Sequence, residues 1–362
     1  MNRSRHGLAL PAALFTLAII SLFIAGSAFT ATQEARASLG TLAERAALET
    51  AEYGAAAMLR DWDPTWNVLT SVGQTLGPFT HTMPNGATAT VRMTRTSVTG
   101  WWVVSEGTTG TAVAREARRT LNALFRLDLV PGVPDAALNV ADSASVTGSG
   151  AVIGTDSIDT TGACASLTSV PTAGVAAPDT TRVSGAGAII GIPPLITDSS
   201  VSMLVSKLDS ALTEDIVLPD GAIVTPSPVA TGAVCDTSVV TNWGDPTGGA
   251  CSRHFPVIRA LGDIIVRGGI GQGIIIAAGD VQFENGAAFS GIVTPRDDFV
   301  TGSGGGSVLG VVIAGDARRG AGDHSVVGSG SWIRRSTCRV HQARLAAAHP
   351  TRITQRWWAE FD

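Results

Sequence analysis

The sequence is poor in charged residues. Asp, Glu, Lys and Arg make up 15% of its 362 residues, whereas apolar and aromatic types make up 44%. Long disordered segments need the opposite balance, high charge and low hydrophobicity, so we expect a folded chain. The formal net charge is −5, and the body of the chain has no run rich in Lys and Arg. A nucleic-acid partner, which is held by neutralising its phosphates, is therefore not expected.

Motifs for catalysis and for metal binding are also lacking. The four cysteines show neither CxxC-like nor Cys/His spacing, so we expect no zinc or other metal and no cofactor. No Gly-x-Ser-x-Gly motif with a paired histidine occurs, and the six histidines are scattered. The glycine-rich run 302–306 lacks the Lys-Ser/Thr pair of a phosphate-binding loop. We therefore expect no enzyme and assign no catalytic residue.

Acidic residues in the second half of the chain have an ordinary structural interpretation. Asp263, Asp280 and Asp316 each follow a glycine. Aspartate side chains in turns often bond the backbone, so each residue is expected to cap or turn the chain.

One long uncharged run is present, from Leu8 to Thr30. About 20 apolar residues are needed for a helix to cross a bilayer, so we expect a transmembrane helix over residues 8–30. Arg3 and Arg5 precede it and should hold the N-terminus in the cytoplasm. The protein is then anchored in the inner membrane, with its body exported to the periplasm, the cell surface or a filament.

Residues 1–7 leave three interpretations open. A cleaved secretory signal peptide would use Gly26-Ser27-Ala28 as its small-residue site. A plain signal anchor would remain uncleaved. A prepilin leader is a short basic stretch ending in glycine and cut on the cytoplasmic side, and Gly7 followed by Leu8 fits it best.

The helix is expected to continue beyond the membrane over residues 31–62, which are rich in Ala, Leu, Glu and Arg. The mostly apolar face predicted from helical spacing consists of Leu39, Leu42, Ala46 and Glu49. A proline disfavours helical geometry in the residue before it, so the helix should end at Asp63-Pro64.

Residues 63–128 predict a small antiparallel sheet. Period-two alternation marks the runs Ala87–Arg95 and Arg119–Leu127, and Trp101–Val104 lies between them. Pro84-Asn85-Gly86 is a turn signal. The apolar face of this sheet must be covered, and the nearest half of the long helix is expected to cover it.

With these features the chain resembles the PilX-type minor pilins, a branch of the type IV pilin-like proteins. The resemblance covers about the first 130 residues and, more loosely, an aromatic tail at 346–362. It is carried by the apolar run and by four short segments, Arg5-His6-Gly7-Leu8-Ala9-Leu10, Gln33-Glu34-Ala35-Arg36, Arg118-Arg119-Thr120-Leu121 and Gln355-Arg356-Trp357-Trp358.

The resemblance implies a non-enzymatic subunit that takes part in pilus or filament assembly or in surface display. A prepilin peptidase would cut between Gly7 and Leu8. Other pilin-like subunits and the pilus assembly machinery would be its partners. Most pilins carry a glutamate five residues after the cut, where this chain has Ala12. That departure favours a tip, initiating or accessory role over a place in the filament shaft.

Residues 129–345 differ in character, because short apolar runs recur there with glycines. Gly273, Gly291 and Gly310 start three of them, and the segments 146–154 and 183–191 repeat a second pattern. Gly-punctuated strands at near-constant spacing predict a parallel β-helix-like domain, with a β-sandwich as the alternative fold. A short helix is expected over 200–212. A membrane-anchored β-helix that binds or cleaves polysaccharide is the alternative function, and a self-assembling scaffold is a third.

All four cysteines follow the anchor, in a compartment where disulfides persist. Four cysteines allow three pairings. Cys235 and Cys251 flank one loop, so we expect that pair first, with Cys164 and Cys338 as the remaining pair.

Overall fold

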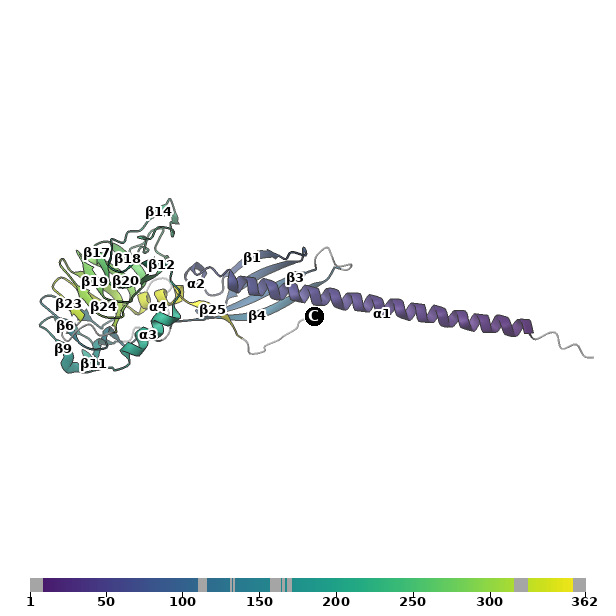
Figure 1. Ribbon diagram of the computed structural model, residues 1–362, viewed down its shortest axis with the longest axis horizontal. Helices are drawn as coiled ribbons and strands as arrows, with labels where there is room; N and C mark the ends of the chain where they lie inside the picture. The colour runs from purple at the N-terminus through teal and green to yellow at the C-terminus, as the bar shows by residue number, and fades with distance from the viewer. Residues whose placement is uncertain are drawn as a thin grey trace, which may run out of the picture.

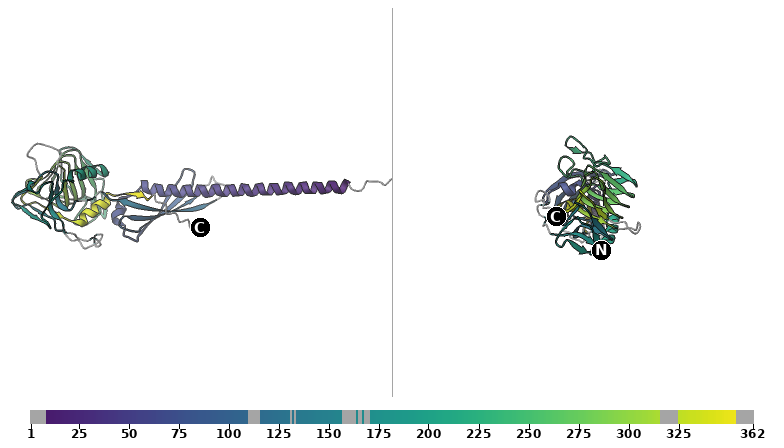
Figure 2. Two further views of the ribbon diagram at one scale, coloured as in Figure 1. Left: turned by 90° about the horizontal axis from the view of Figure 1, so that it is seen from below. Right: turned by 90° about the vertical axis from the view of Figure 1, so that its left-hand side faces the viewer.

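The structure is a computed structural model. It describes residues 9–109, 116–130, 132, 134–156, 164, 167, 171–315 and 325–353. The molecule is elongated: helix α1 (Ala9–Arg60) projects from one end, a small sheet packs on its second half, and a mainly β region follows (Figures 1 and 2).

Helix α1 is continuous for 52 residues, because no proline interrupts its Ala- and Leu-rich sequence after the first turn. At 1.5 Å per residue its length is about 78 Å. It ends shortly before the predicted stop at Asp63-Pro64, and a short helix, α2 (Thr65–Leu69), follows.

The predicted antiparallel sheet is present, and it has five strands. Its order is β1-β2-β3-β4-β25. The strands are β1 (Thr75–Thr82), β2 (Thr88–Arg95), β3 (Gly100–Thr108), β4 (Arg118–Asp128) and β25 (His349–Arg352). The last strand corrects the prediction that 346–362 is only a tail: residues 349–352 return to pair with β4.

Helix α1 covers the apolar face of this sheet, but not with the face predicted from the sequence. Leu39 and Leu42 are about half exposed. The buried residues are mainly small, namely Ala43, Ala47, Thr50, Ala51, Gly54, Ala55, Ala57 and Met58. The sheet approaches so closely that a Cβ on Gly107 would lie 2.1 Å from the Ala47 carbonyl oxygen. Alanine therefore decides which face is buried.

The mainly β region consists of many short strands and two helices, and the predicted helix over 200–212 is confirmed as α3. The elements are β5 (Ala136–Val140), β6 (Ala144–Val146), β7 (Ala151–Ile153), β8 (Ala173–Ala177), η2 (Thr180–Arg182), β9 (Val183–Ser184), β10 (Ala188–Ile190), β11 (Leu195–Thr197), α3 (Val201–Ala211), β12 (Ile216–Leu218), β13 (Ala222–Val224), β14 (Ala230–Thr231), β15 (Val234–Cys235), β16 (Val257–Ala260), β17 (Ile264–Arg267), β18 (Ile270–Ala277), β19 (Val281–Glu284), β20 (Ala287–Pro295), β21 (Phe299–Thr301), β22 (Gly306–Ala314), β23 (Ser325–Val327), β24 (Trp332–Arg335) and α4 (Thr337–Ala346).

The strands form an 11-stranded sheet, a 7-stranded sheet and the hairpin β14–β15, and from β16 to β24 successive strands alternate between the two large sheets. Within the described part of the region, every strand pair except β14–β15 is parallel. The antiparallel pairs that a β-sandwich is built from are confined to that one hairpin. The chain therefore winds round a common interior shared by both sheets, and adjacent circuits are joined by parallel strand pairs.

The repeated glycines mark one corner of the winding. Gly273 pairs with Gly291, and Gly291 pairs with Gly310, in the adjacent strands β18, β20 and β22. All three have positive φ, between 116° and 153°. Residues other than glycine rarely adopt such a φ, so each of the three paired strands needs glycine at this position.

The circuits do not stack in the order in which they occur along the chain. The circuit β5–β7 lies on the circuit that ends in β24, because β5 pairs with β22, β6 with β23 and β7 with β24. The following strands, up to β11, lie on the other side of the β5–β7 circuit. Helix α3 packs on the outside of the stack, and β12 begins at the opposite end (Figure 1).

Asp263 and Asp280 accept hydrogen bonds from the backbone, as expected, but from a neighbouring circuit and not from their own turn. Asp220 accepts a hydrogen bond from the Asp263 N–H, Asp263 accepts one from Asp280, and Asp280 accepts one from Asp298. These carboxylates connect the turns that follow successive strands. Asp316 lies outside the described residues.

Candidate assembly interface

The first half of α1 is apolar, and no other described part of the chain packs against it. Its large side chains are between 39% and 76% exposed, and they are Leu10, Leu14, Phe15, Leu17, Ile19, Ile20, Leu22, Phe23, Ile24 and Phe29. In the described chain this is the one helix that is long and apolar enough to cross a membrane. Its position near the N-terminus is compatible with either a membrane anchor or a signal. So large an apolar surface must be covered by lipid or by other protein.

The residues at the predicted cut, Gly7 and Leu8, lie outside the described residues, as do Trp357 and Trp358 of the tail. Ala12 is exposed on α1, and its carbonyl accepts a hydrogen bond from the Thr16 hydroxyl. Its methyl side chain offers no charge for pairing with a neighbouring subunit.

The second half of α1 is held to the sheet by packing and by one ion pair. Met58 and the alanines of α1 share a core with Trp101 and Phe125 of the sheet. Arg119 of β4 also forms an ion pair with Glu44, at 2.8 Å. The helix is therefore free along its apolar half and fixed along its alanine-rich half.

Helix α4 links the helix–sheet part to the β region. The buried Asn67 amide donates hydrogen bonds to the Leu345 and Ala348 carbonyls, both at 2.9 Å. On the other side, Arg344 donates to the Val130 carbonyl and Arg335 donates to the Pro134 carbonyl. The side chains of α4 enter both cores, so the two parts are joined through a packed junction.

Two disulfides are present, and they join the pairs that the sequence analysis favoured. Cys164 joins Cys338 at the start of α4, and Cys235 joins Cys251. The second bond closes part of the insertion between β13 and β16, which carries the hairpin β14–β15.

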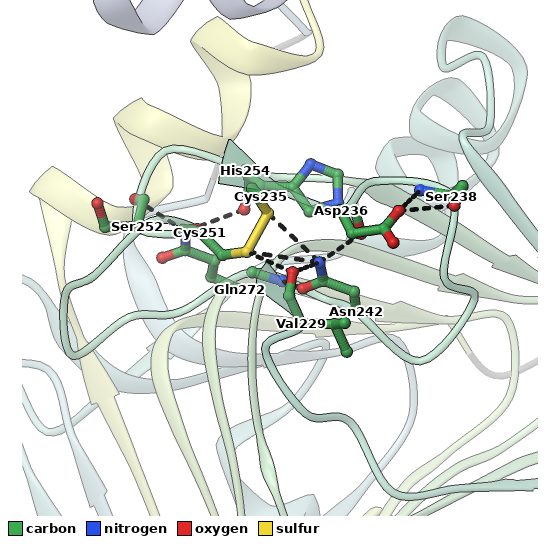
Figure 3. Close-up of a disulfide and its surroundings, with 10 residues drawn as sticks. Val229, Cys235, Asp236, Ser238, Asn242, Cys251, Ser252, His254 and Gln272 are labelled. Carbon is green, nitrogen blue, oxygen red and sulfur yellow. Dashed lines mark hydrogen bonds between the residues drawn. A yellow bond between two sulfur atoms is a disulfide. The ribbon is translucent and has the colours of Figure 1, made fainter. Parts of the chain in front are cut away.

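Figure 3 shows how this insertion is anchored on the β region. The fully buried Asn242 amide donates to the Val229 and Asp236 carbonyls at 2.9 and 2.7 Å, beside the disulfide sulfurs. Gln272 of β18 donates to the Ser252 and His254 carbonyls, both at 2.9 Å. Two buried amides thus fix the backbone on both sides of the disulfide.

We expect the double variant Cys235→Ser, Cys251→Ser to open this insertion locally. The two amides would keep their partners, but the loop ends would regain freedom that the crosslink removes. Limited digestion with thermolysin should cut within 225–256 much faster than in the parent chain. Thr237→Ala, an exposed change in the same loop, should leave the digestion rate unchanged. Equal rates in the double variant and the parent would contradict this role of the disulfide.

Three buried amides that hold these parts together were not identified from the sequence. Asn67, Gln272 and Asn242 are single amides without a repeated spacing, so no pattern marked them. Their importance arises from burial and from partners far along the chain, such as Leu345 for Asn67. Among the described residues, no group of three or more His, Cys, Asp or Glu side chains could hold a metal ion.

Comparisons with known proteins add little to this geometry. No family model and no curated protein match the sequence. Among solved structures, the chain is similar to the competence-associated pilin ComZ from Thermus thermophilus, at 11% identity and a TM-score of 0.23. The match covers 86% of this chain and 96% of that one. A TM-score this low does not establish a shared fold.

Proposed function

We propose that this chain is a non-enzymatic minor pilin-like subunit of the PilX type, which takes part in the assembly or display of a type IV pilus or a related filament. One observation carries the proposal. Helix α1 is apolar and uncovered along its first half, and its alanine-rich second half packs on an antiparallel sheet. Such a helix can pass from the membrane into a bundle of like helices while the sheet and the β region stay folded.

The proposal includes further points about location and shape. The helix would be anchored in the inner membrane through residues 8–30, with the body exported. The β region would be a parallel β-helix displayed at the far end, which the stacked parallel pairs support. Ala12 in place of an acidic residue favours a tip, initiating or accessory role. Other pilin-like subunits, the assembly machinery and a prepilin peptidase would be the partners.

The N-terminus of the mature protein tests this proposal. We expect mass spectrometry of the membrane fraction to find a chain that starts at Leu8. That start should disappear when the prepilin peptidase of the host is deleted. A start at Met1 in both strains would identify a plain anchor, and a start near Phe29 would identify a secreted protein. Either result would contradict the proposal.

A further inference from the structure

A cleft of about 770 Å³ lies at the junction of the helix–sheet part and the β region. The segment after α2 and the turn between β2 and β3 line it from one side. The loop that follows Asp245 and helix α4 line it from the other. Sites for small molecules in proteins have volumes of roughly 300–1,000 Å³, so the cleft has the size of a ligand site.

The charged groups of the cleft are mostly cationic, in a chain whose net charge is −5. Arg95, Arg253 and Arg339 line the cleft, and Asp245 is the only carboxylate among its lining residues. None of the three arginines forms an ion pair with any residue that the structure describes. The three arginines thus bring more positive charge to the lining than the single carboxylate of Asp245 offsets.

The three arginines differ in what they can offer. Arg95 is buried and fixed, because its guanidinium donates to the Thr70, Ser97 and Val98 carbonyls. It contributes its charge to the cleft from a fixed position, and three of its five N–H groups are already used. Arg339 donates to the Pro246 carbonyl at 3.2 Å and keeps further N–H groups. Arg253 is exposed and has no hydrogen bond to a described residue.

The positive charges near the cleft also affect a histidine that lines it. His341 lines the cleft, and its pKa lies below the ordinary value because of burial and the positive charges of Arg344 and Arg95. The imidazole is therefore neutral near pH 7, and it can donate or accept a hydrogen bond without adding charge.

We propose that this cleft binds a small oxyanion, with a phosphate or carboxylate group held by Arg253 and Arg339 in the field of Arg95. Guanidinium groups match the geometry of both anions, and such charge-assisted hydrogen bonds are the strong ones. Phe255 is the only Phe, Tyr or Trp of the lining and is 6% exposed, so the wall offers none of the large exposed rings on which bases stack. A small anion fits these walls better than a nucleic-acid strand does.

Calorimetric titration of the full chain in detergent with pyrophosphate, and separately with citrate, tests the proposal. We expect saturable binding of at least one probe, weakened by added salt. Binding of pyrophosphate alone would assign a phosphorylated ligand, and binding of citrate alone a carboxylated one. Arg253→Gln should weaken binding roughly tenfold or more, because it removes a charge-assisted hydrogen bond without touching the fold. Arg339→Gln should do the same.

Arg92→Gln provides the matched control, because Arg92 is an exposed arginine on the sheet, away from the cleft. It should leave the affinity unchanged. Absence of saturable binding of either probe would overturn the proposal. An equal loss of affinity in Arg92→Gln and Arg253→Gln would also overturn it, because attraction to the overall charge would then explain the binding. The filament role does not depend on either result.

Discussion

Gly291→Ala is expected to destabilise the β region by at least about 4 kcal/mol, which is rare for a single substitution. A Cβ at this position would lie 2.0 Å from the Gly273 carbonyl oxygen in the strand beneath. The contact is with backbone of the stack, so no side chain can turn away to relieve it. The φ of 138° is also one that residues other than glycine rarely adopt. Thermal unfolding of the full chain in detergent, followed by circular dichroism, measures the effect.

Gly221→Ala is the control for this substitution. Gly221 also has positive φ, at 69°, but a Cβ there would meet nothing within 4 Å. We expect a cost of only about 1–2 kcal/mol, from the backbone conformation alone. If the two variants unfold at the same temperature, the glycine corner is not the tight contact that the structure indicates.

Asn67→Ala is expected to cost about 3–4 kcal/mol, because it leaves buried groups without partners. The Asn67 amide serves the Leu345 and Ala348 carbonyls, and its oxygen accepts the Trp62 indole N–H at 3.0 Å. Asn67 is fully buried, so its removal leaves three polar groups without their protein partners. Hydrogen exchange should therefore quicken in α4 and β25 before it does so in the stack.

Asn122→Ala tests whether the loss is specific to the junction. Asn122 lies on β4, is only half-buried and has no side-chain hydrogen bond to a described residue. Its removal should change the free energy of unfolding by less than about 0.5 kcal/mol. Similar losses in both asparagine variants would show that α4 is not held through Asn67.

Local patterns predicted much of this fold. The uncharged run and the Ala-rich segment after it predicted one long helix, and alternation predicted the strands that became β2 and β4. Glycine spacing found positions that do pair in register, Gly273 with Gly291 and Gly291 with Gly310. In each case the residues that form the pattern lie close together in the sequence, within a few helical turns or one repeat.

Contacts between segments that are distant in the sequence could not be predicted from such local patterns. Strand β25 is four residues long, and its partner β4 lies more than 200 residues earlier. The buried face of α1 was predicted wrongly because close approach to Gly107 favours alanine over leucine there. The order of the circuits was also missed, since a repeat shows that circuits stack without showing which two are neighbours.

The order of the circuits has a consequence for the timing of folding. Strands β5, β6 and β7 precede most of the β region in the chain, yet they pair with β22, β23 and β24, which follow more than 100 residues later. Parallel pairing across such a separation is slow to form, and exposed strand edges are prone to aggregate meanwhile. Folding of the β region must therefore await synthesis of almost the whole chain, and an incomplete chain that lacks β22 to β24 presents an open strand edge to its neighbours.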